Sequence, residues 1–386
     1  MKNLLRWLSR RRFPYEPLIT VEVSRARLLH NLNEFRVLAP QGQVAPVLKS
    51  NAYGHGLYEV ASILERESSI PFFIVDSYFE AVALRAKRIR TPILIVGYTR
   101  PDTIINSRIK NVSFVISSLE ALEKISGGKM PCWKSARIQL KIDTGMRRQG
   151  LLPEEVDRAI DLIKDDPNLI LEGICTHLSD ADDTDTSFTD GQISLWNRTV
   201  KKIRGAFPHL KYIHASATDG HQFTREIDAN ISRLGIGLYG LSENQMLMKK
   251  IGLKPVMKIK TIVTGVKTLK LGESTGYGNT FVADHDMTIA TIPFGYFEGL
   301  DRRLSNTGSV LVSKGRTICP IIGRISMNIS TIDVSRVDHP KIGDEVIVIS
   351  DNASDPNSII SHEKHIGSIT YETVVKIPGH LKRIVV

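Results

Sequence analysis

The sequence predicts a (β/α)8 barrel followed by a C-terminal all-β domain. Eight short apolar runs alternate with segments of helical periodicity between residues 43 and 238. This alternation is typical of a parallel sheet whose strands are joined by helices. Eight such units in roughly 200–250 residues is the size of a closed barrel. After Pro255 short β-rich runs and glycine-containing turns dominate, which predicts an all-β domain.

The expected barrel strands alternate with helices along the chain. The strand-like runs are 43–49, 72–77, 93–98, 112–117, 138–143, 171–177, 212–217 and 231–238. Helical spacing is clear at 57–64, 78–88, 154–163 and 187–203. An open doubly wound sheet is the alternative, but the Gly-x-Gly-x-x-Gly turn after its first strand is absent.

One more strand is expected at 18–23, followed by a helix to about Leu38. The strands expected in the C-terminal part are 258–266, 287–292, 309–312, 317–322, 327–334 and 345–350, with a last helix near 368–375. These patterns predict a basic leader at 1–17, a barrel at 18–254 and a β-domain at 255–386.

Composition and cysteine usage favour a cytoplasmic protein. The chain of 386 residues is 42% hydrophobic and 24% charged, which is ordinary for a globular protein. No apolar run approaches the roughly 20 residues of a membrane span. Cys132, Cys175 and Cys319 are far apart and have no metal-ligand spacing, so no metal site is expected. An odd cysteine count without a secretion signal suits a reducing compartment.

The net charge is +10, and basic residues are concentrated in one segment, residues 1–12. Elsewhere the positive charge is spread and carries no nucleic-acid motif, so we expect no nucleic-acid partner. Residues 1–12 hold five basic and no acidic side chains, with leucines and Trp7 on one helical face. An amphipathic helix lying on an anionic membrane is one interpretation, and a solvated leader is the other.

Lys49 follows the buried strand expected from Gln43 to Leu48. Burying the charged amine of a lysine there costs free energy unless the amine has a function. One such function is imine formation with an aldehyde cofactor. The alternative is a lysine whose amine reaches solvent. The decapeptide Val-Leu-Lys-Ser-Asn-Ala-Tyr-Gly-His-Gly at 47–56 closely resembles the cofactor-lysine signature of the alanine racemases. Those are pyridoxal-phosphate enzymes that interconvert L- and D-alanine. The resemblance implies that Lys49 carries pyridoxal 5'-phosphate as a Schiff base and that Tyr53 helps to hold its phosphate.

The resemblance covers nearly the whole chain after about residue 17. A barrel followed by a β-domain is also the architecture of that family, in which the first strand, here 18–23, packs with the β-domain. Functional groups in a barrel gather at the carboxyl ends of the strands. Polar segments follow four further strands here, at 141–150, 176–177, 214–218 and 233–236.

The resemblance assigns cofactor contacts to matching residues. Arg233 matches an arginine placed against the pyridine nitrogen, and His177 matches a histidine that packs on the ring and contacts Arg233. Taken alone, His177 is better explained as a core histidine, and Arg233 could form an ion pair with a nearby acid. The implied phosphate ligands are Tyr53, Thr218, the backbone of Gly235 and Ile236, and Tyr371.

Racemisation needs a proton removed from one face of the α-carbon and returned to the other, so two bases are expected. Lys49 is one of them. Tyr277, in a segment that resembles the family's catalytic tyrosine motif, is the other. Arg148 matches the arginine that binds the substrate carboxylate. Lys141 matches a lysine that many members carry as a carbamate, and neutralisation by Asp143 is the alternative.

Two segments of the β-domain depart from the family pattern. Gly323–Asn328 resembles Gly-Arg-Val-Cys-Met-Asp, with Ser326 in place of the cysteine and Asn328 in place of the acid. In this segment Met327 is the implied substrate contact. In Gly295–Gly299, which resembles the entrance segment, Tyr296 is the implied gate, while Phe297 and Glu298 replace smaller or shorter residues. A third departure is Arg147, where glycine is usual.

The sequence therefore predicts a homodimeric alanine racemase that supplies D-alanine for peptidoglycan. The connection near Pro255 is short, and the resemblance implies that Tyr277 enters the partner's active site in a two-fold dimer. A serine or broad-specificity racemase is the alternative. Arg233 argues against a decarboxylase of the same barrel type, and the β-domain argues against a non-catalytic cofactor carrier. Any membrane contact is expected only through residues 1–12.

Overall fold

The computed structural model describes residues 15–39, 42–130, 135–181, 185–218, 220, 226–244, 248, 250–312 and 316–386. The leader at 1–12 and Cys132 lie outside these residues. The chain forms two compact units. One consists of residues 23–256, 369–375 and 385–386, and the other of residues 1–22, 257–368 and 376–384.

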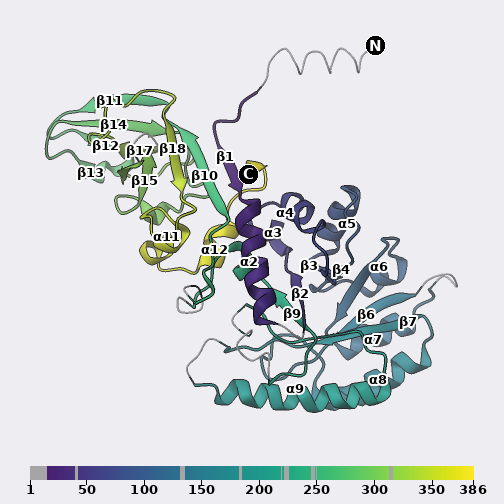
Figure 1. Ribbon diagram of the computed structural model, residues 1–386. Coiled ribbons are helices and arrows are strands. Elements are labelled where there is room, and N and C mark those ends of the chain that lie inside the picture. Colours follow the sequence, from purple (N-terminus) through teal and green to yellow (C-terminus); the bar gives the residue numbers. More distant parts are fainter. Residues whose placement is uncertain are drawn as a thin grey trace, which may run out of the picture. The chain divides into compact units, whose positions relative to one another are not determined.

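The first unit is built on a parallel sheet, and all eight expected strands are confirmed (Figure 1). The strands are β2 (Gln43–Pro46), β3 (Phe73–Val75), β4 (Ile93–Ile95), β5 (Val112–Ile116), β6 (Ala136–Lys141), β7 (Leu169–Cys175), β8 (Tyr212–His214) and β9 (Ile231–Leu234). Their order is β2-β9-β8-β7-β6-β5-β4-β3 among the described residues. A parallel bridge from Val47 to Ile74 joins β2 to β3, so the sheet closes into a barrel.

Helices surround the barrel strands (Figure 1). Those that follow barrel strands include α4 (Leu57–Leu64), α5 (Tyr78–Ala86), α6 (Pro101–Asn106), α7 (Leu119–Ser126), α8 (Val156–Asp165) and α9 (Ser187–Ala206). The helix α2 (Arg25–Leu38) precedes β2, the short element α3 (Lys49–Tyr53) follows β2, and α12 (Thr370–Val375) comes from the C-terminal part of the chain. Serine side chains cap three of them by accepting from backbone N–H groups, at Ser24, Ser77 and Ser118. Strands β3, β4 and β5 are buried throughout, as expected for a sheet covered by helices.

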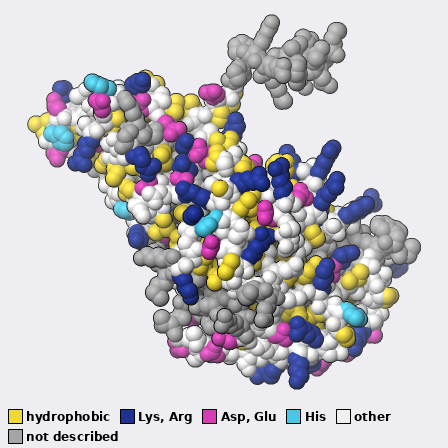
Figure 2. Space-filling view, in the orientation of Figure 1, with side chains coloured by type: hydrophobic (Ala, Val, Ile, Leu, Met, Phe, Trp, Pro, Cys, Tyr) yellow, Lys and Arg dark blue, Asp and Glu magenta, His cyan; other side chains and the backbone are white. Residues whose placement is uncertain are grey.

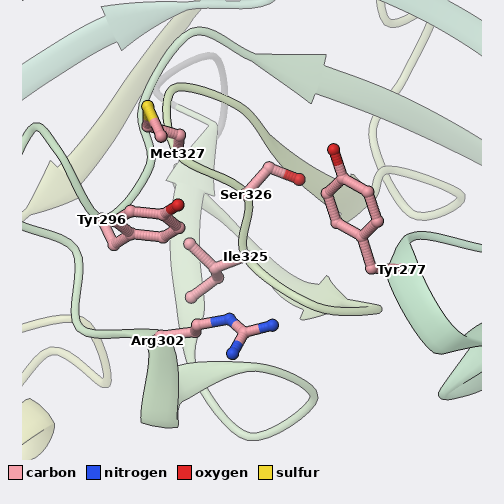
Figure 3. Close-up of a pocket in the computed structure, with 6 residues that line it drawn as sticks. All are labelled: Tyr277, Tyr296, Arg302, Ile325, Ser326 and Met327. Atoms are coloured by element: carbon pink, nitrogen blue, oxygen red, sulfur yellow. The ribbon is translucent and has the colours of Figure 1, made fainter.

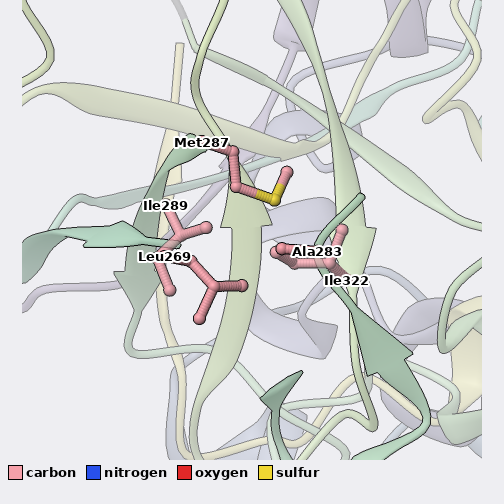
Figure 4. Packing of buried hydrophobic residues seen from close by; sticks show 5 residues of the cluster. All are labelled: Leu269, Ala283, Met287, Ile289 and Ile322. Atoms are coloured by element: carbon pink, nitrogen blue, oxygen red, sulfur yellow. The ribbon is translucent and has the colours of Figure 1, made fainter. Parts of the chain in front are cut away.

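The second unit is mostly strands. They are β1 (Thr20–Val23), β10 (Met257–Ile262), β11 (Gly265–Leu269), β12 (Ser274–Thr275), β13 (Phe281–Val282), β14 (Met287–Ile292), β15 (Ser309–Val312), β16 (Thr317–Ile322), β17 (Ser330–Asp333), β18 (Glu345–Ile349) and β19 (Lys382–Val385), with one α-helix among the described residues, α11 (Ile359–Ile366). Strand β1 lies between β10 and β19 in the sheet of this unit. Leu269 of β11, Met287 and Ile289 of β14, Ile322 of β16 and Ala283 form a small core (Figure 4).

Most barrel strands are shorter than expected, and β12, β13 and β19 were not expected. Two of the strands expected in the β-domain differ for a reason that the hydrogen bonds show. The run expected at 258–266 is two strands, because the chain changes partner at a corner. Val263 N–H donates to Asp344, beside β18, whereas Thr264 N–H donates to Thr291 of β14. The strand expected at 327–334 begins only at Ser330, because Ser326 N–H donates to the carbonyl of Ile329 and closes a turn before it.

Surface charge is mixed on the face seen in Figure 2, where lysine and arginine side chains are interspersed with acidic ones. Within the described ranges, no helix has both the length and the apolar character that crossing a membrane requires.

Candidate active site

Lys49 lies at the carboxyl end of β2, where the chain enters an unusual turn. Leu48 N–H donates to the carbonyl of Ile74 over 2.7 Å, and Lys49, half-buried, begins α3. Ser50 to Tyr53 all have φ between 50° and 56°, so α3 is a left-handed turn. That conformation costs roughly 1–2 kcal/mol per residue for L-amino acids. Surrounding contacts must therefore hold this turn, as is common at functional sites.

The carboxylate of Glu80 supplies part of that support. Glu80, in the first turn of α5, accepts hydrogen bonds from Asn51 N–H at 3.0 Å and from Asp76 N–H at 2.9 Å. The side-chain oxygen of Asn51 in turn accepts from Leu57 N–H at 2.9 Å, at the start of α4. The turn is thus tied to the end of β3 and to two helices, which fixes the direction in which the Lys49 side chain leaves the sheet.

Next to this turn, two hydroxyl groups lie close to the backbone of Gly235. A Cβ atom placed on Gly235 would lie 3.0 Å from the Tyr53 hydroxyl and 3.8 Å from Thr218 Oγ1. Gly237 N–H donates to Thr218 Oγ1 at 3.2 Å, and the Tyr371 ring lies 6.0 Å from that of Tyr53. Burial raises the pKa of Tyr53, so its hydroxyl stays a donor. Hydroxyl donors around a glycine backbone suit a phosphate group.

Arg233 is buried in β9 and joins two histidines. Its guanidinium donates to Nδ1 of His214 at 2.8 Å and to Nδ1 of His177 at 3.0 Å. It also donates to the carbonyl oxygens of Thr176, His214 and Ala215 at 2.7–3.1 Å. Arginine has no acceptor, so each Nδ1 offers a lone pair. Nε2 of His214 consequently carries a proton and donates to Gln139 Oε1 at 2.6 Å.

The electrostatics of this cluster keep both imidazoles neutral. Desolvation, reinforced by the charge of Arg233, lowers the pKa of His177 to about 3. The same two causes lower the pKa of His214 well below its ordinary value. The cluster therefore presents a single fixed cation, Arg233, held by two neutral rings.

Lys141 ends β6, beside the loop that contains Arg148. Burial lowers the pKa of Lys141, and its amine donates to Gln149 Oε1 at 3.4 Å. Asp143 Oδ1 accepts from the N–H groups of Gly145 and Arg147 at 2.8 and 3.1 Å. No ion pair joins Lys141 to Asp143 among the described residues. The carboxylate therefore organises the loop, while Arg148 is exposed.

Sequence reasoning missed the buried polar group that supports this loop. Gln192, on α9, donates to Thr144 Oγ1 at 3.3 Å, and its carbonyl oxygen accepts from Ser179 N–H at 3.0 Å. Thr144 and Thr176 hydroxyls lie 2.8 Å apart. A glutamine 48 residues from its partner carries no local signal. Gln139, which accepts a hydrogen bond from His214, is 75 residues from its partner and likewise carries no local signal.

In the β-rich unit, the expected substrate-side residues line one pocket of about 570 Å³ (Figure 3). The residues around it are Tyr277, Tyr296, Arg302, Ile325, Ser326 and Met327. Tyr277 is 68% exposed and is flanked by Gly276 and Gly278, whose φ values of 82° and 71° favour glycine. Tyr296 and Met327 are also exposed, at 44% and 55%.

The predicted residues thus fall into two groups, one in each unit. The barrel unit contains Lys49, Tyr53, Lys141, Arg148, His177, Thr218, Arg233, Gly235, Ile236 and Tyr371. The β-rich unit contains Tyr277, Tyr296 and Met327. The described residues include no group of three or more histidine, cysteine, aspartate or glutamate side chains arranged to hold a metal ion.

Two family models together match most of the chain. Residues 23–243 match the model of the alanine racemase N-terminal domain, and residues 256–385 match that of the C-terminal domain. An alanine racemase of Methanococcus maripaludis is 33% identical over 369 residues, covering 95% of this chain and 98% of that protein.

Solved structures extend the likeness to three dimensions. An alanine racemase of Clostridium difficile 630 superposes with a TM-score of 0.89 at 29% identity, covering 96% of each chain. A histidine racemase of Leuconostoc mesenteroides subsp. sake superposes with a TM-score of 0.86 at 27% identity, covering 97% of this chain and 99% of that one. With both domain models matched in order and the relatives aligned almost end to end, the chain belongs to the alanine racemase family.

Proposed function

We propose that this protein interconverts L- and D-alanine, with pyridoxal 5'-phosphate as cofactor and Lys49 and Tyr277 as the two bases. The observation that carries the proposal is the arrangement around the Lys49 turn. A lysine after a strand end, the Tyr53 and Thr218 hydroxyls beside the backbone of Gly235, and a buried arginine occur in one unit. The proposed product role is supply of D-alanine for peptidoglycan in the cytoplasm.

The residues present fit the proposed cofactor. When bound, pyridoxal phosphate makes the α-proton of an amino acid removable. The phosphate would be held by Tyr53, Thr218, Tyr371 and the backbone of Gly235 and Ile236. Arg233 would face the ring nitrogen, and because arginine keeps its proton, that nitrogen would remain unprotonated. We infer that this arrangement limits side reactions such as transamination.

The substrate would be oriented by residues of both units. Arg148 is proposed to bind the substrate carboxylate, Met327 to offer a backbone contact and Tyr296 to limit access. Lys141 is a candidate for carbamylation. Burial lowers the pKa of Lys141 and so enlarges the neutral fraction that reacts with carbon dioxide, releasing one proton as the N–C bond forms.

We further propose a two-fold homodimer in which Tyr277 of one protomer serves the Lys49 site of its partner. The exposure of Tyr277, at 68%, and of Tyr296 and Met327 around the pocket supports this arrangement. Large apolar side chains that remain exposed around a pocket mark an interaction surface. Both sites of a two-fold dimer are built alike.

A racemisation assay across the twenty amino acids tests the function. Alanine is expected to be the best substrate, with serine next, because one extra group in a small apolar pocket is discriminated by only about 1–3 kcal/mol. The likeness to a histidine racemase makes histidine the necessary comparison substrate. A clear preference for histidine, lysine or arginine would overturn the alanine assignment, and no racemisation of any amino acid would overturn the enzyme class.

A further inference from the structure

Two of the departures from the family pattern contact each other beside the pocket. Asn328 Nδ2 donates to Glu298 Oε1 at 2.7 Å. The other carboxylate oxygen of Glu298 accepts from Gly295 N–H at 2.9 Å. Glu298 is only 6% exposed, and among the described residues no cation forms an ion pair with it. Its two hydrogen bonds are therefore what compensates for burying the carboxylate.

Backbone hydrogen bonds also join the two segments that carry the pocket-lining residues Tyr296 and Met327. Tyr296 N–H donates to the Ser326 carbonyl at 3.1 Å, and Phe297 N–H donates to the Met327 carbonyl at 2.9 Å. A Cβ on Gly295 would collide with the carbonyl oxygens of both Ser326 and Met327. The backbones thus touch at Gly295, and Glu298 holds Gly295 N–H on one side and Asn328 on the other.

The pairing explains why an amide stands at position 328. An aspartate there, as in the family pattern, would place two carboxylates at hydrogen-bond distance, which disfavours ionisation of both. An amide instead presents an N–H donor to the carboxylate. The longer side chain of Glu298 and the amide of Asn328 are therefore matched to each other.

We propose that Glu298 and Asn328 form a positioning pair that sets the spacing of Tyr296 and Met327, and thereby the size of substrate side chain that the pocket admits. The pair acts through the backbone of both segments and touches no substrate itself. This inference rests on the proposed racemase function, and it assigns substrate selection to two residues outside the pocket lining.

The test is a four-member cycle of wild type, Glu298→Gln, Asn328→Asp and the exchanged double variant. Asn328→Asp, although it installs the family residue, is expected to lower kcat/KM for alanine roughly 10- to 100-fold, because displacement of substrate-positioning groups by about 1 Å has effects of that size. Glu298→Gln is expected to be milder, since rotation of the Asn328 amide restores a donor–acceptor pair. In the double variant the amide introduced at position 298 donates to the carboxylate introduced at position 328. The same amide still accepts from Gly295 N–H, so activity should return to within about threefold of wild type.

The substrate profile separates positioning from general destabilisation. In Asn328→Asp the loss of kcat/KM should come mainly from a higher KM, and the loss should be larger for alanine than for serine or histidine. The exchanged double variant should restore the wild-type ratio of kcat/KM between these substrates. The control is Asp344→Asn, another carboxylate that accepts from a backbone N–H in the β-rich unit, at 2.9 Å, but does not line the pocket. It should leave the ratio unchanged.

The outcomes of these assays distinguish failure of the positioning pair from failure of the proposed function. Additive losses without rescue, or an unchanged substrate ratio in Asn328→Asp, would overturn the positioning pair. If wild type racemises no amino acid, the proposed function fails. The contact between the two side chains is then tested by thermal unfolding, where Asn328→Asp alone should lower Tm and the exchange should restore it.

Discussion

Arg233 and His177 are joined by a hydrogen bond of 3.0 Å from the guanidinium to Nδ1 of the imidazole. His214 accepts a second such bond at 2.8 Å from the same guanidinium. The positive charge of this cluster is therefore confined to one side chain. The guanidinium is held in place by five acceptors, all of them at the carboxyl ends of β7 and β8.

Replacement of Arg233 by lysine should loosen the site although the charge is kept. An ammonium group has three donors and no planar fork, so at least two of the five acceptors lose the donor that arginine supplies. The His214 carbonyl also accepts from Thr176 N–H, so at least one acceptor is left unpaired. Each unpaired buried group costs about 1–3 kcal/mol, so the free energy of unfolding should fall by about 1 kcal/mol or more. Urea unfolding and cofactor retained after dialysis measure the two effects. Arg137→Lys, at an exposed pair with Glu172, is the control, and equal stability of the two variants would contradict the assigned role.

The cofactor attachment can be mapped directly. Reduction of the holoenzyme with borohydride is expected to fix pyridoxal phosphate covalently to a single peptide, which contains Lys49. Lys49→Ala should show no such labelled peptide, and Lys141→Ala should retain it. A label on a peptide that lacks Lys49 would refute the assignment of the barrel mouth.

If each active site is built from both protomers, two inactive variants should recover activity when they form mixed dimers. Lys49→Ala and Tyr277→Phe homodimers should each be nearly inactive in racemisation. If they are unfolded, mixed equally and refolded, random pairing makes about half of the dimers mixed, and each mixed dimer has one site with neither defect. About a quarter of all sites should then be intact. A mixture that stays inactive despite confirmed subunit exchange would place both bases in one chain.

Arg147 adopts a φ of 55°, in the left-handed region of backbone conformation that favours glycine. Glycine is also the residue that the family pattern has at this position. Arg147→Gly should relieve this strain and raise the free energy of unfolding by up to about 1 kcal/mol, after the greater chain entropy of glycine is subtracted. Arg147→Ala removes the guanidinium but keeps the Cβ, so it should not stabilise the protein. Equal Tm values for the two variants would show that the charge, and not the backbone, matters.

Stability should fall in mild acid partly because of His362. This histidine is buried in α11, and desolvation lowers its pKa to about 4. Between its ordinary pKa of about 6.5 and pH 4 the unfolded chain binds a proton that the folded protein does not, so stability falls as the pH falls, by at most about 1.4 kcal/mol per pH unit. Urea unfolding of His362→Gln at several pH values should show a smaller slope than wild type. Exposed His339→Gln is the control, and equal slopes in both variants would refute the effect.

Much of the fold could be predicted because its signals are local. The apolar runs that became β2 to β9 have the length and spacing of barrel strands, and the segment around Lys49 is a contiguous motif. The corner between β10 and β11 was missed because both strands lie in one β-rich run. Only the change of pairing partner at Val263 and Thr264 separates them.

The sequence by itself determined the architecture, the family and the candidate residues, because periodicity and contiguous motifs are written along the chain. Only the tertiary structure decided how those residues are held. The left-handed turn after Lys49, the five acceptors of Arg233 and the contact between Glu298 and Asn328 join residues that are distant in the chain or in strained conformations. Such contacts depend on the distances that the packed strands impose, and no local pattern encodes those distances.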